Sequence, residues 1–129
     1  MELFSLKGKT VAITGASSGF GHHFAGVLAS AGASLILGAR RLDKIQDRVN
    51  EINDLGGNAL GVALDVRDPD SCESFLGTAQ NEYGSVDVLI NNAGVEAGAK
   101  TFAMIEEEDW DYVFDTNLKS VWRLSKMYT

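Results

Sequence analysis

The sequence has little cysteine and no long apolar run, and each scarcity excludes a class of protein. Its one cysteine, Cys72, cannot form a disulfide within the chain, which favours a reducing compartment. No apolar stretch approaches the ~20 residues that a membrane-spanning helix needs. The first five residues contain an early acidic residue and no apolar core, unlike a signal peptide. We therefore expect a cytoplasmic protein with no membrane partner.

Positive charge is also scarce, with 11 Lys and Arg against 18 Asp and Glu and a net charge of −7. A surface of this sign disfavours binding to nucleic acid. The two histidines, His22 and His23, are adjacent. On a helix they point about 100° apart and cannot chelate one metal ion as an i, i+4 pair does. We expect no nucleic-acid partner and no metal site.

What the sequence does have is an alternation of apolar runs and amphipathic segments, without repeats or linkers. The runs at 11–14, 34–38, 59–64 and 86–90 predict buried strands. Helical spacing predicts helices at 20–31, 42–55 and 69–83, and a last helix that carries the apolar residues between Trp110 and Leu124. Asp68-Pro69 predicts the start of the third of these helices, with Asp68 as N-cap and Pro69 at the first helical position.

This βαβαβαβα order predicts an α/β fold built on an open parallel sheet with helices on both faces. The expected strand order is 3-2-1-4, which is half of a doubly wound, Rossmann-like fold. A chain of 129 residues fits one domain over 1–129.

The junction at 14–21, Thr-Gly-Ala-Ser-Ser-Gly-Phe-Gly, follows the first strand and opens the first helix. Its glycines permit a sharp turn, close approach of a phosphate to backbone, and close packing of the helix. The helix N-terminus offers unpaired N–H groups and roughly half a positive charge, which favours a pyrophosphate. The alternative is a tight turn in which Ser17 or Ser18 caps the helix.

The residues after the second strand are Ala39-Arg40-Arg41, where an acidic residue would hold the 2′-hydroxyl of an NAD ribose. A guanidinium at this place suits a 2′-phosphate, to which it donates two charge-assisted hydrogen bonds. We expect Arg40 to have this role more than Arg41. The alternative is two solvated arginines.

Two further segments follow strands, and the carboxyl ends of strands line the ligand crevice of such sheets. Asp65-Val66 can accept a hydrogen bond from an adenine amino group and supply an apolar wall, or can be a loop ahead of Asp68. The run at 91–94, Asn-Asn-Ala-Gly, can satisfy backbone groups where strands separate, or can be an ordinary turn.

The glycine pattern at 14–21, Asp65-Val66, the run at 91–94 and Asn117 in Thr-Asn-Leu together resemble the short-chain dehydrogenase/reductase family from about residue 6 to 129. The resemblance implies binding of NADP rather than NAD and activity on a carbonyl or alcohol. It implies these cofactor-binding residues: Gly15, Ser17, Ser18, Gly19, Phe20, Gly21, Arg40, Arg41, Asp65, Val66, Asn92, Ala93 and Gly94. Asn117 matches a catalytic position. Phe20 replaces a residue that is often aliphatic in the family.

The chain departs from the family pattern at its end. The family's Ser and Tyr-x-x-x-Lys follow well downstream of the position matched by Asn117, and no such motif is present here. We expect Ser125, Lys126 and Tyr128 to form one turn of the last helix. The sequence leaves two alternatives: the truncated, cofactor-binding half of an oxidoreductase that is inactive alone, or a non-catalytic nucleotide-binding or self-assembling module.

The fourth strand and the last helix also predict self-association. The strand has no proline or lysine, the residues that usually prevent pairing at a sheet edge. The last helix carries more apolar residues than one sheet face covers. We expect a homo-oligomer, most simply a two-fold dimer, that uses both surfaces.

Overall fold

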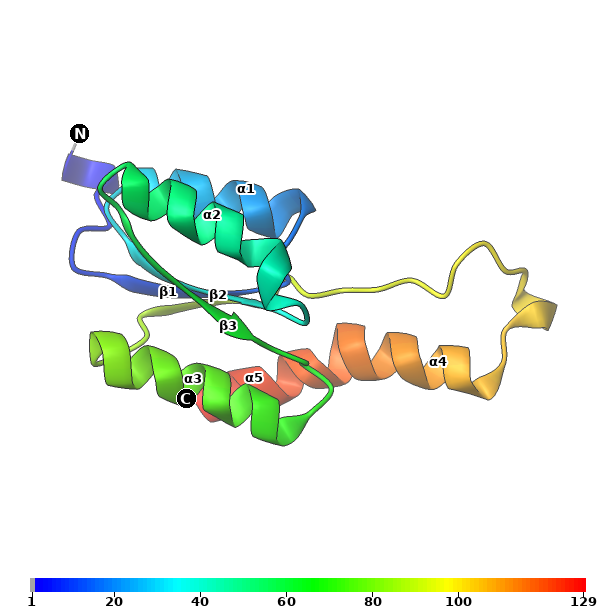
Figure 1. Cartoon of the computed structure of the whole chain (residues 1–129). Coiled ribbons are helices and arrows are strands. Elements are labelled where there is room, and N and C mark those ends of the chain that lie inside the picture. The colour runs from blue at the N-terminus through cyan, green and yellow to red at the C-terminus, as the bar shows by residue number, and fades with distance from the viewer. Residues whose placement is uncertain (1) are drawn as a thin grey trace.

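A computed structural model describes residues 2–129 and contains one parallel sheet with the strand order β3-β2-β1-β4 (Figure 1). This order and the α/β alternation confirm the prediction. The strands are β1 (Thr10–Thr14), β2 (Ser34–Ala39), β3 (Asn58–Ala63) and β4 (Val88–Ile90). The α-helices are α1 (Gly19–Ser30), α2 (Leu42–Asp54), α3 (Pro69–Tyr83), α4 (Glu107–Phe114) and α5 (Ser120–Tyr128). Short 3₁₀ turns span Glu2–Phe4 and Phe102–Met104.

Two helices cover each face of the sheet, with α1 and α2 on one side and α3 and α5 on the other (Figure 1). Alternate residues of a strand point to opposite faces, so each strand feeds two cores. Val11 and Leu35 join the core under α1 and α2. Ala12 and Ile36 join the core that contains Phe75 of α3. The two cores hold the sheet rigidly and fix the positions of its strand ends.

The start of α3 follows the predicted chemistry. The Asp68 carboxylate accepts a hydrogen bond from the Asp70 N–H at 3.0 Å, and Pro69 occupies the first turn. Proline fits there because its missing N–H has no partner in a helix in any case. The helix ends at Gly84, whose φ is 85°.

The predicted last helix is not one regular α-helix. A π-helical segment, Asp115–Lys119, joins α4 to α5. The spacing of apolar residues could not reveal it, because one wider turn shifts the helix face by about one residue. The Ser120 hydroxyl donates to the Thr116 carbonyl oxygen at 2.5 Å within this region. The π-helical segment contains Asn117.

The fourth strand is shorter than predicted, since 86 and 87 lie outside it. The Asp87 carboxylate accepts the Thr10 N–H at 2.8 Å, and the Asp87 N–H donates to the Thr10 carbonyl oxygen at 2.9 Å. The Asp87 side chain therefore pairs with the Thr10 N–H, which a regular ladder would pair with a backbone carbonyl oxygen. The edge available for strand pairing is three residues long.

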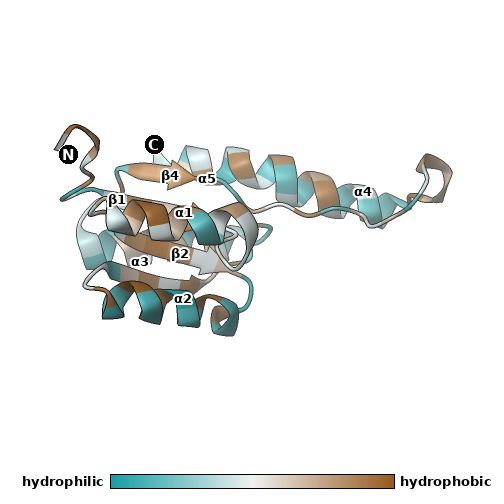
Figure 2. Cartoon of the chain, turned by 90° about the horizontal axis from the view of Figure 1, so that it is seen from above, coloured by the Kyte–Doolittle hydropathy of each residue, from teal (hydrophilic) through white to brown (hydrophobic). Residues whose placement is uncertain are grey.

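The chain between β4 and α4 leaves the body of the fold and returns along α4, which projects beyond the sheet (Figures 1 and 2). The Lys100 ammonium holds this segment to α4 through the Asp109 carboxylate, 2.6 Å away. No helix within residues 2–129 has the length and apolarity to cross a membrane.

Candidate functional site

A cleft of about 370 Å³ lies at the carboxyl ends of the four strands. Four segments far apart in sequence meet there, because parallel strands all end at the same edge of a sheet. Ten of the predicted site residues line it: Gly15, Ser17, Ser18, Phe20, Arg40, Asp65, Val66, Asn92, Ala93 and Gly94. The lining also contains Ala39, Leu64, Arg67, Val95, Tyr112 and Thr116.

The glycine turn is packed tightly against the loop that follows β4. Gly15 has a φ of +63°, and a Cβ at this residue would lie 2.7 Å from Ala93 Cα. A Cβ at Gly21 would lie 2.5 Å from the Gly15 carbonyl oxygen and 2.6 Å from Asn92 Nδ2. Neither position can hold a larger side chain without moving backbone. The glycines thus bring the N-terminus of α1 against the end of β4.

The N-terminus of α1 has no side-chain cap. Ser18 is the N-cap residue, but its side chain makes no capping hydrogen bond, so the first-turn N–H groups lack that partner. Gly19 has a φ of +57°, and a Cβ there would meet no atom within 4 Å. Any other residue would be strained at this φ, although the space around Gly19 is open. Phe20 beside it is exposed and stacks on Phe24 with ring centroids 6.0 Å apart.

A buried threonine at the end of β1 holds the loop after β4. The Thr14 hydroxyl accepts the N–H of Asn92 at 3.0 Å and of Ala93 at 2.9 Å. The Asn92 amide donates to the Gly15 carbonyl oxygen at 2.9 Å. These contacts leave Gly94 exposed at the cleft. The prediction that an asparagine satisfies backbone groups where strands separate is confirmed for Asn92.

Both polar atoms of the Asn117 side-chain amide form hydrogen bonds with the loop after β4. Its Oδ1 accepts the Val95 N–H and its Nδ2 donates to the Val95 carbonyl oxygen, each at 2.7 Å. Asn117 does not line the cleft but fixes the backbone that does. The neighbouring Thr116 lines the cleft, and its buried hydroxyl oxygen has no hydrogen-bond partner within the described chain. A buried polar atom of this kind normally finds a partner.

The two arginines after β2 have different surroundings. The Arg40 guanidinium lines the cleft and donates to the Tyr112 hydroxyl at 3.1 Å. Arg41 lies outside the cleft lining and pairs with the Asp43 carboxylate at 2.8 Å. The hydrogen bond from Arg41 holds the pKa of Asp43 below its ordinary value. Among the side chains of residues 3–129, no carboxylate lies within ion-pair distance of Arg40, so these residues do not neutralise its charge.

The loop after β3 is fixed from two sides. The Asp65 N–H donates to the Ser71 hydroxyl at 2.9 Å, and the Asp65 carboxylate accepts the Arg67 N–H at 3.0 Å. Val66 is buried, and its carbonyl oxygen accepts from Arg123 at 2.9 Å. The exposed Asp65 carboxylate retains acceptor capacity toward the cleft, while Val66 supplies an apolar wall.

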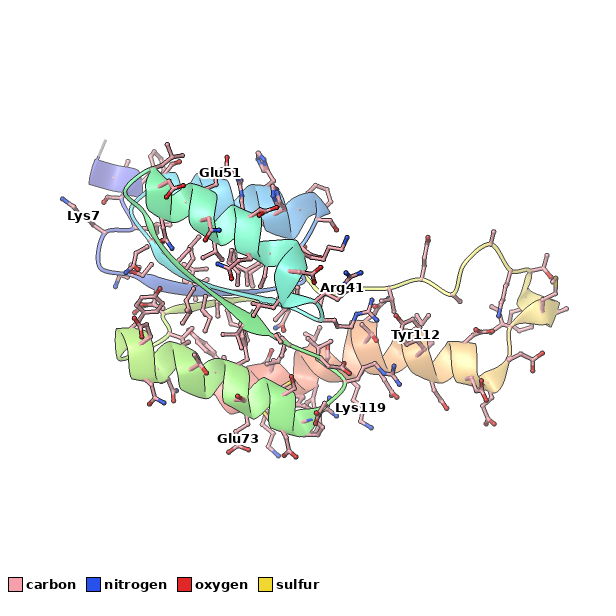
Figure 3. All side chains as sticks on the ribbon, viewed as in Figure 1. Lys7, Arg41, Glu51, Glu73, Tyr112 and Lys119 are labelled. Atoms are coloured by element: carbon pink, nitrogen blue, oxygen red, sulfur yellow. The ribbon has the colours of Figure 1, made fainter. Side chains whose placement is uncertain are left out.

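The sequence reasoning did not identify Thr14, Arg67, Tyr112 or Thr116 as site residues. Arg67 directly follows Asp65-Val66, and Tyr112 lies one helical turn before Thr116, on the same face. These positions relative to Asp65-Val66 and Thr116 were the signals from which Arg67 and Tyr112 could have been identified. Tyr112 projects from α4 toward the strand ends (Figure 3). The Arg67 guanidinium carbon lies 5.0 Å from the centre of the Tyr112 ring.

Ser125, Lys126 and Tyr128, which we did not assign to catalysis, do not line the cleft. The Tyr128 hydroxyl donates to the Asp87 carbonyl oxygen, which precedes β4 and so lies at the opposite end of that strand. The Ser125 hydroxyl accepts from the Asn91 amide at 3.3 Å. Lys126 lies over the ring of Trp122, 5.4 Å from its centre. As predicted, all of these residues belong to the end of the last helix.

Comparisons with known proteins agree with this architecture. Residues 9–129 match the family model for short chain dehydrogenases. A 3-oxoacyl-[acyl-carrier-protein] reductase of Vibrio cholerae is 41% identical over 95% of this chain, which covers 48% of that protein. A metagenomic short-chain oxidoreductase solved with NADP has a TM-score of 0.90 at 33% identity, over 95% of this chain and 56% of its own.

A short chain dehydrogenase/reductase from Burkholderia phymatum, solved with NAD, has a TM-score of 0.91 at 33% identity, over 97% of this chain and 44% of its own. The chain therefore spans about half the length of the relatives that it matches. Its fold and its family match extend over nearly all of its own residues. The chain belongs to the short-chain dehydrogenase family.

Proposed function

We propose that this chain is the NADP(H)-binding part of an oxidoreductase that acts on a carbonyl or alcohol. The observation that carries the proposal is Arg40, an arginine in the cleft with no carboxylate partner, which directly follows Ala39 at the place where an acidic residue would select NAD. One solved relative contains NADP and another contains NAD, so the choice rests on the residues of this chain.

The cleft has features that fit such a cofactor. Open space above Gly19 and the uncapped N-terminus of α1 suit a pyrophosphate. The unpartnered Thr116 hydroxyl offers one further hydrogen bond inside the cleft. We assign the proposed contacts as follows: Gly15, Ser17, Ser18, Gly19, Phe20 and Gly21 to the pyrophosphate and adjoining ribose, Arg40 and secondarily Arg41 to the 2′-phosphate, Asp65 and Val66 to adenine, and Asn92, Ala93 and Gly94 to the nicotinamide ribose.

The bound cofactor would supply a hydride to a carbonyl carbon or accept one from an alcohol carbon. The residues of this chain would bind it, orient it and exclude water from its phosphates. Asn117 contributes by holding the loop that contains Val95, and we propose that its part in the reaction acts through this loop.

A titration of both cofactors tests the proposal. A charge-assisted hydrogen bond contributes ~1.5–3 kcal/mol, so NADPH should bind roughly ten- to a hundredfold more tightly than NADH. Calorimetry measures both affinities, and Arg40→Ala should reduce the difference. Equal affinities, or tighter binding of NADH, would contradict the proposal.

A second function, a nucleotide-binding module without turnover, is favoured by the position of Tyr128. The printed sequence has no Tyr-x-x-x-Lys motif, and the Tyr128 hydroxyl is engaged at the end of β4 remote from the cleft. General acid–base catalysis is typically worth ~10²–10⁴-fold in rate. The 129-residue chain should therefore bind cofactor without oxidising or reducing a panel of alcohols and ketones. Sustained turnover that Tyr128→Phe abolishes would contradict this second candidate.

We also propose that the protein self-associates through the β4 edge and the outer face of α4 and α5, and that it is cytoplasmic. Trp110, Phe114, Leu118 and Trp122 are all exposed on this helical arm. Figure 2 shows apolar residues spaced along it and on β4. Burial of one such side chain is worth ~1.5–3 kcal/mol, which favours association.

A further inference from the structure

Tyr112 of α4 lies between two cationic side chains at one end of the cleft. The Arg40 guanidinium donates to its hydroxyl oxygen at 3.1 Å, and the Arg67 guanidinium lies over its ring, 5.0 Å from the centre. All three side chains line the cleft. They come from the loop after β2, the loop after β3 and a helix that follows β4, so the fold alone brings them together.

Neither guanidinium in this group is neutralised by the protein. Within residues 3–129 the ion pairs of arginine are Arg41 with Asp43 and Arg48 with Glu51, and neither involves the cleft. The two unpaired guanidiniums lie together although the chain has a net charge of −7. A phosphate monoester carries about −1.5 to −2 charges at neutral pH and accepts several hydrogen bonds.

We propose that Arg67 is a further cationic ligand of the 2′-phosphate and that Tyr112 positions Arg40 and Arg67 for it. This inference rests on the proposed function, since it adds Arg67 and Tyr112 to the arginines already assigned to that phosphate. The Tyr112 hydroxyl oxygen accepts from Arg40, which leaves its own hydrogen free to be donated to a phosphate oxygen. The Tyr112 ring holds Arg67 by a cation–π contact that leaves the N–H groups of Arg67 available.

The test uses two probes that contain only the adenosine half of the cofactor: adenosine 2′,5′-bisphosphate and AMP. They differ by the 2′-phosphate alone. Arg67→Gln should weaken binding of the bisphosphate about tenfold, the value of one charge-assisted hydrogen bond, and leave AMP binding unchanged. Arg67→Lys should restore part of the loss because it keeps the charge.

Tyr112→Phe keeps the ring over which Arg67 lies and removes only the hydroxyl. It should weaken the bisphosphate by about threefold to tenfold, as expected for one hydrogen bond, without changing AMP affinity. Lys44→Gln is the matched control, since it removes one exposed positive charge at the start of α2 outside the cleft. Retained AMP binding shows that each variant is folded.

Three outcomes separate the failures. If the unmodified protein binds both probes equally, the NADP(H) proposal itself is contradicted. If Arg40→Gln removes the preference for the bisphosphate while Arg67→Gln and Tyr112→Phe do not, the NADP(H) proposal stands and this inference is overturned. If Arg67→Gln weakens both probes equally, Arg67 contacts the adenine or the shared 5′-phosphate, and its assignment to the 2′-phosphate is overturned.

Discussion

Residues 10–83 and residues 88–128 bury their apolar side chains to very different extents. In the first region, Ile13, Ile36 and Phe75 are fully enclosed between sheet and helices. In the second, Leu118 is 63% exposed and Trp122 is 58% exposed, although α5 also contributes the fully buried Leu124 to the core. The first region therefore contributes most of the buried apolar side chains, whereas the second contributes Leu124 and leaves several large apolar side chains exposed.

The two regions also use polar side chains differently. The first supplies cleft residues from rigid strand ends, as Thr14 does when its hydroxyl accepts two N–H groups from the loop after β4. The second is held to the first by specific contacts, such as those of Tyr112 with Arg40 and of Arg123 with the Val66 carbonyl oxygen. The cleft thus depends on how accurately a less enclosed region docks against a well-packed one.

The sharpest test of this difference in packing compares two large aromatic side chains. Phe75→Ala should destabilise the fold by about 3–5 kcal/mol, because it leaves a cavity between α3 and the sheet. Trp122→Lys should change the stability of the monomer by no more than about 0.5 kcal/mol. Urea unfolding of both variants at low protein concentration measures the two values. Similar losses would show that the helical arm has a core of its own.

The second test concerns the glycine turn that joins the two regions. Gly15→Val introduces a β-branched residue at a φ of +63° and a Cβ 2.7 Å from Ala93 Cα. Left-handed backbone costs about 1–2 kcal/mol and overpacking about 1–3 kcal/mol, so a loss of about 2–5 kcal/mol is expected, together with loss of cofactor binding.

Gly77→Ala is the matched control for that substitution. Gly77 lies inside α3, and a Cβ there would meet no atom within 4 Å. Alanine should stabilise the helix by about 0.5–1 kcal/mol. If close packing requires glycine at residue 15, the change in melting temperature should be negative for Gly15→Val and positive for Gly77→Ala. A tolerated valine at residue 15 would contradict the tight junction.

The third test addresses what covers the exposed apolar residues. Light scattering at micromolar concentration should give a mass above the 13.8 kDa of one chain. Val88→Lys and Trp122→Lys should each shift the protein toward monomer, because a charge at an apolar interface loses its hydration. Val27→Lys changes an equally exposed apolar residue on α1 and should have no effect. A stable monomer would contradict self-association. Association that only Val27→Lys disrupts would show that the interface lies elsewhere.

The smallest expected effect is local and depends on pH. The hydrogen bond from Lys100, helped by the Glu106 N–H, holds the pKa of Asp109 below 3.8. The ionised carboxylate is therefore favoured in the folded protein, and its stabilising contribution is present above that value and lost as the pH falls below it. Proteolysis of the segment at 94–106 should accelerate as the pH is lowered from about 5 to about 3. Asp109→Asn should remove this dependence, and Asp111→Asn should preserve it.

The alternation of strands and helices was determined by local sequence. Apolar runs of four to six residues bounded by glycine or polar residues predicted each strand, and Asp68-Pro69 predicted the start of α3. Right-handed connections between parallel strands then leave few possible strand orders, so the order β3-β2-β1-β4 followed. The same logic placed the glycine turn, Arg40, Asp65-Val66 and 91–94 at one edge, because each directly follows a strand.

Only the tertiary structure determined the contacts between these segments. Arg40 and Tyr112 are 72 residues apart, and the spacing of neither residue encodes their hydrogen bond. The pairings of Asn117 with Val95 and of Asp87 with Thr10 likewise join residues that are far apart in the sequence. Periodicity in the sequence shows which face of a helix or strand is apolar. These contacts depend instead on where a polar side chain meets a distant partner. The position of that partner is fixed only when the sheet and its helices have packed together.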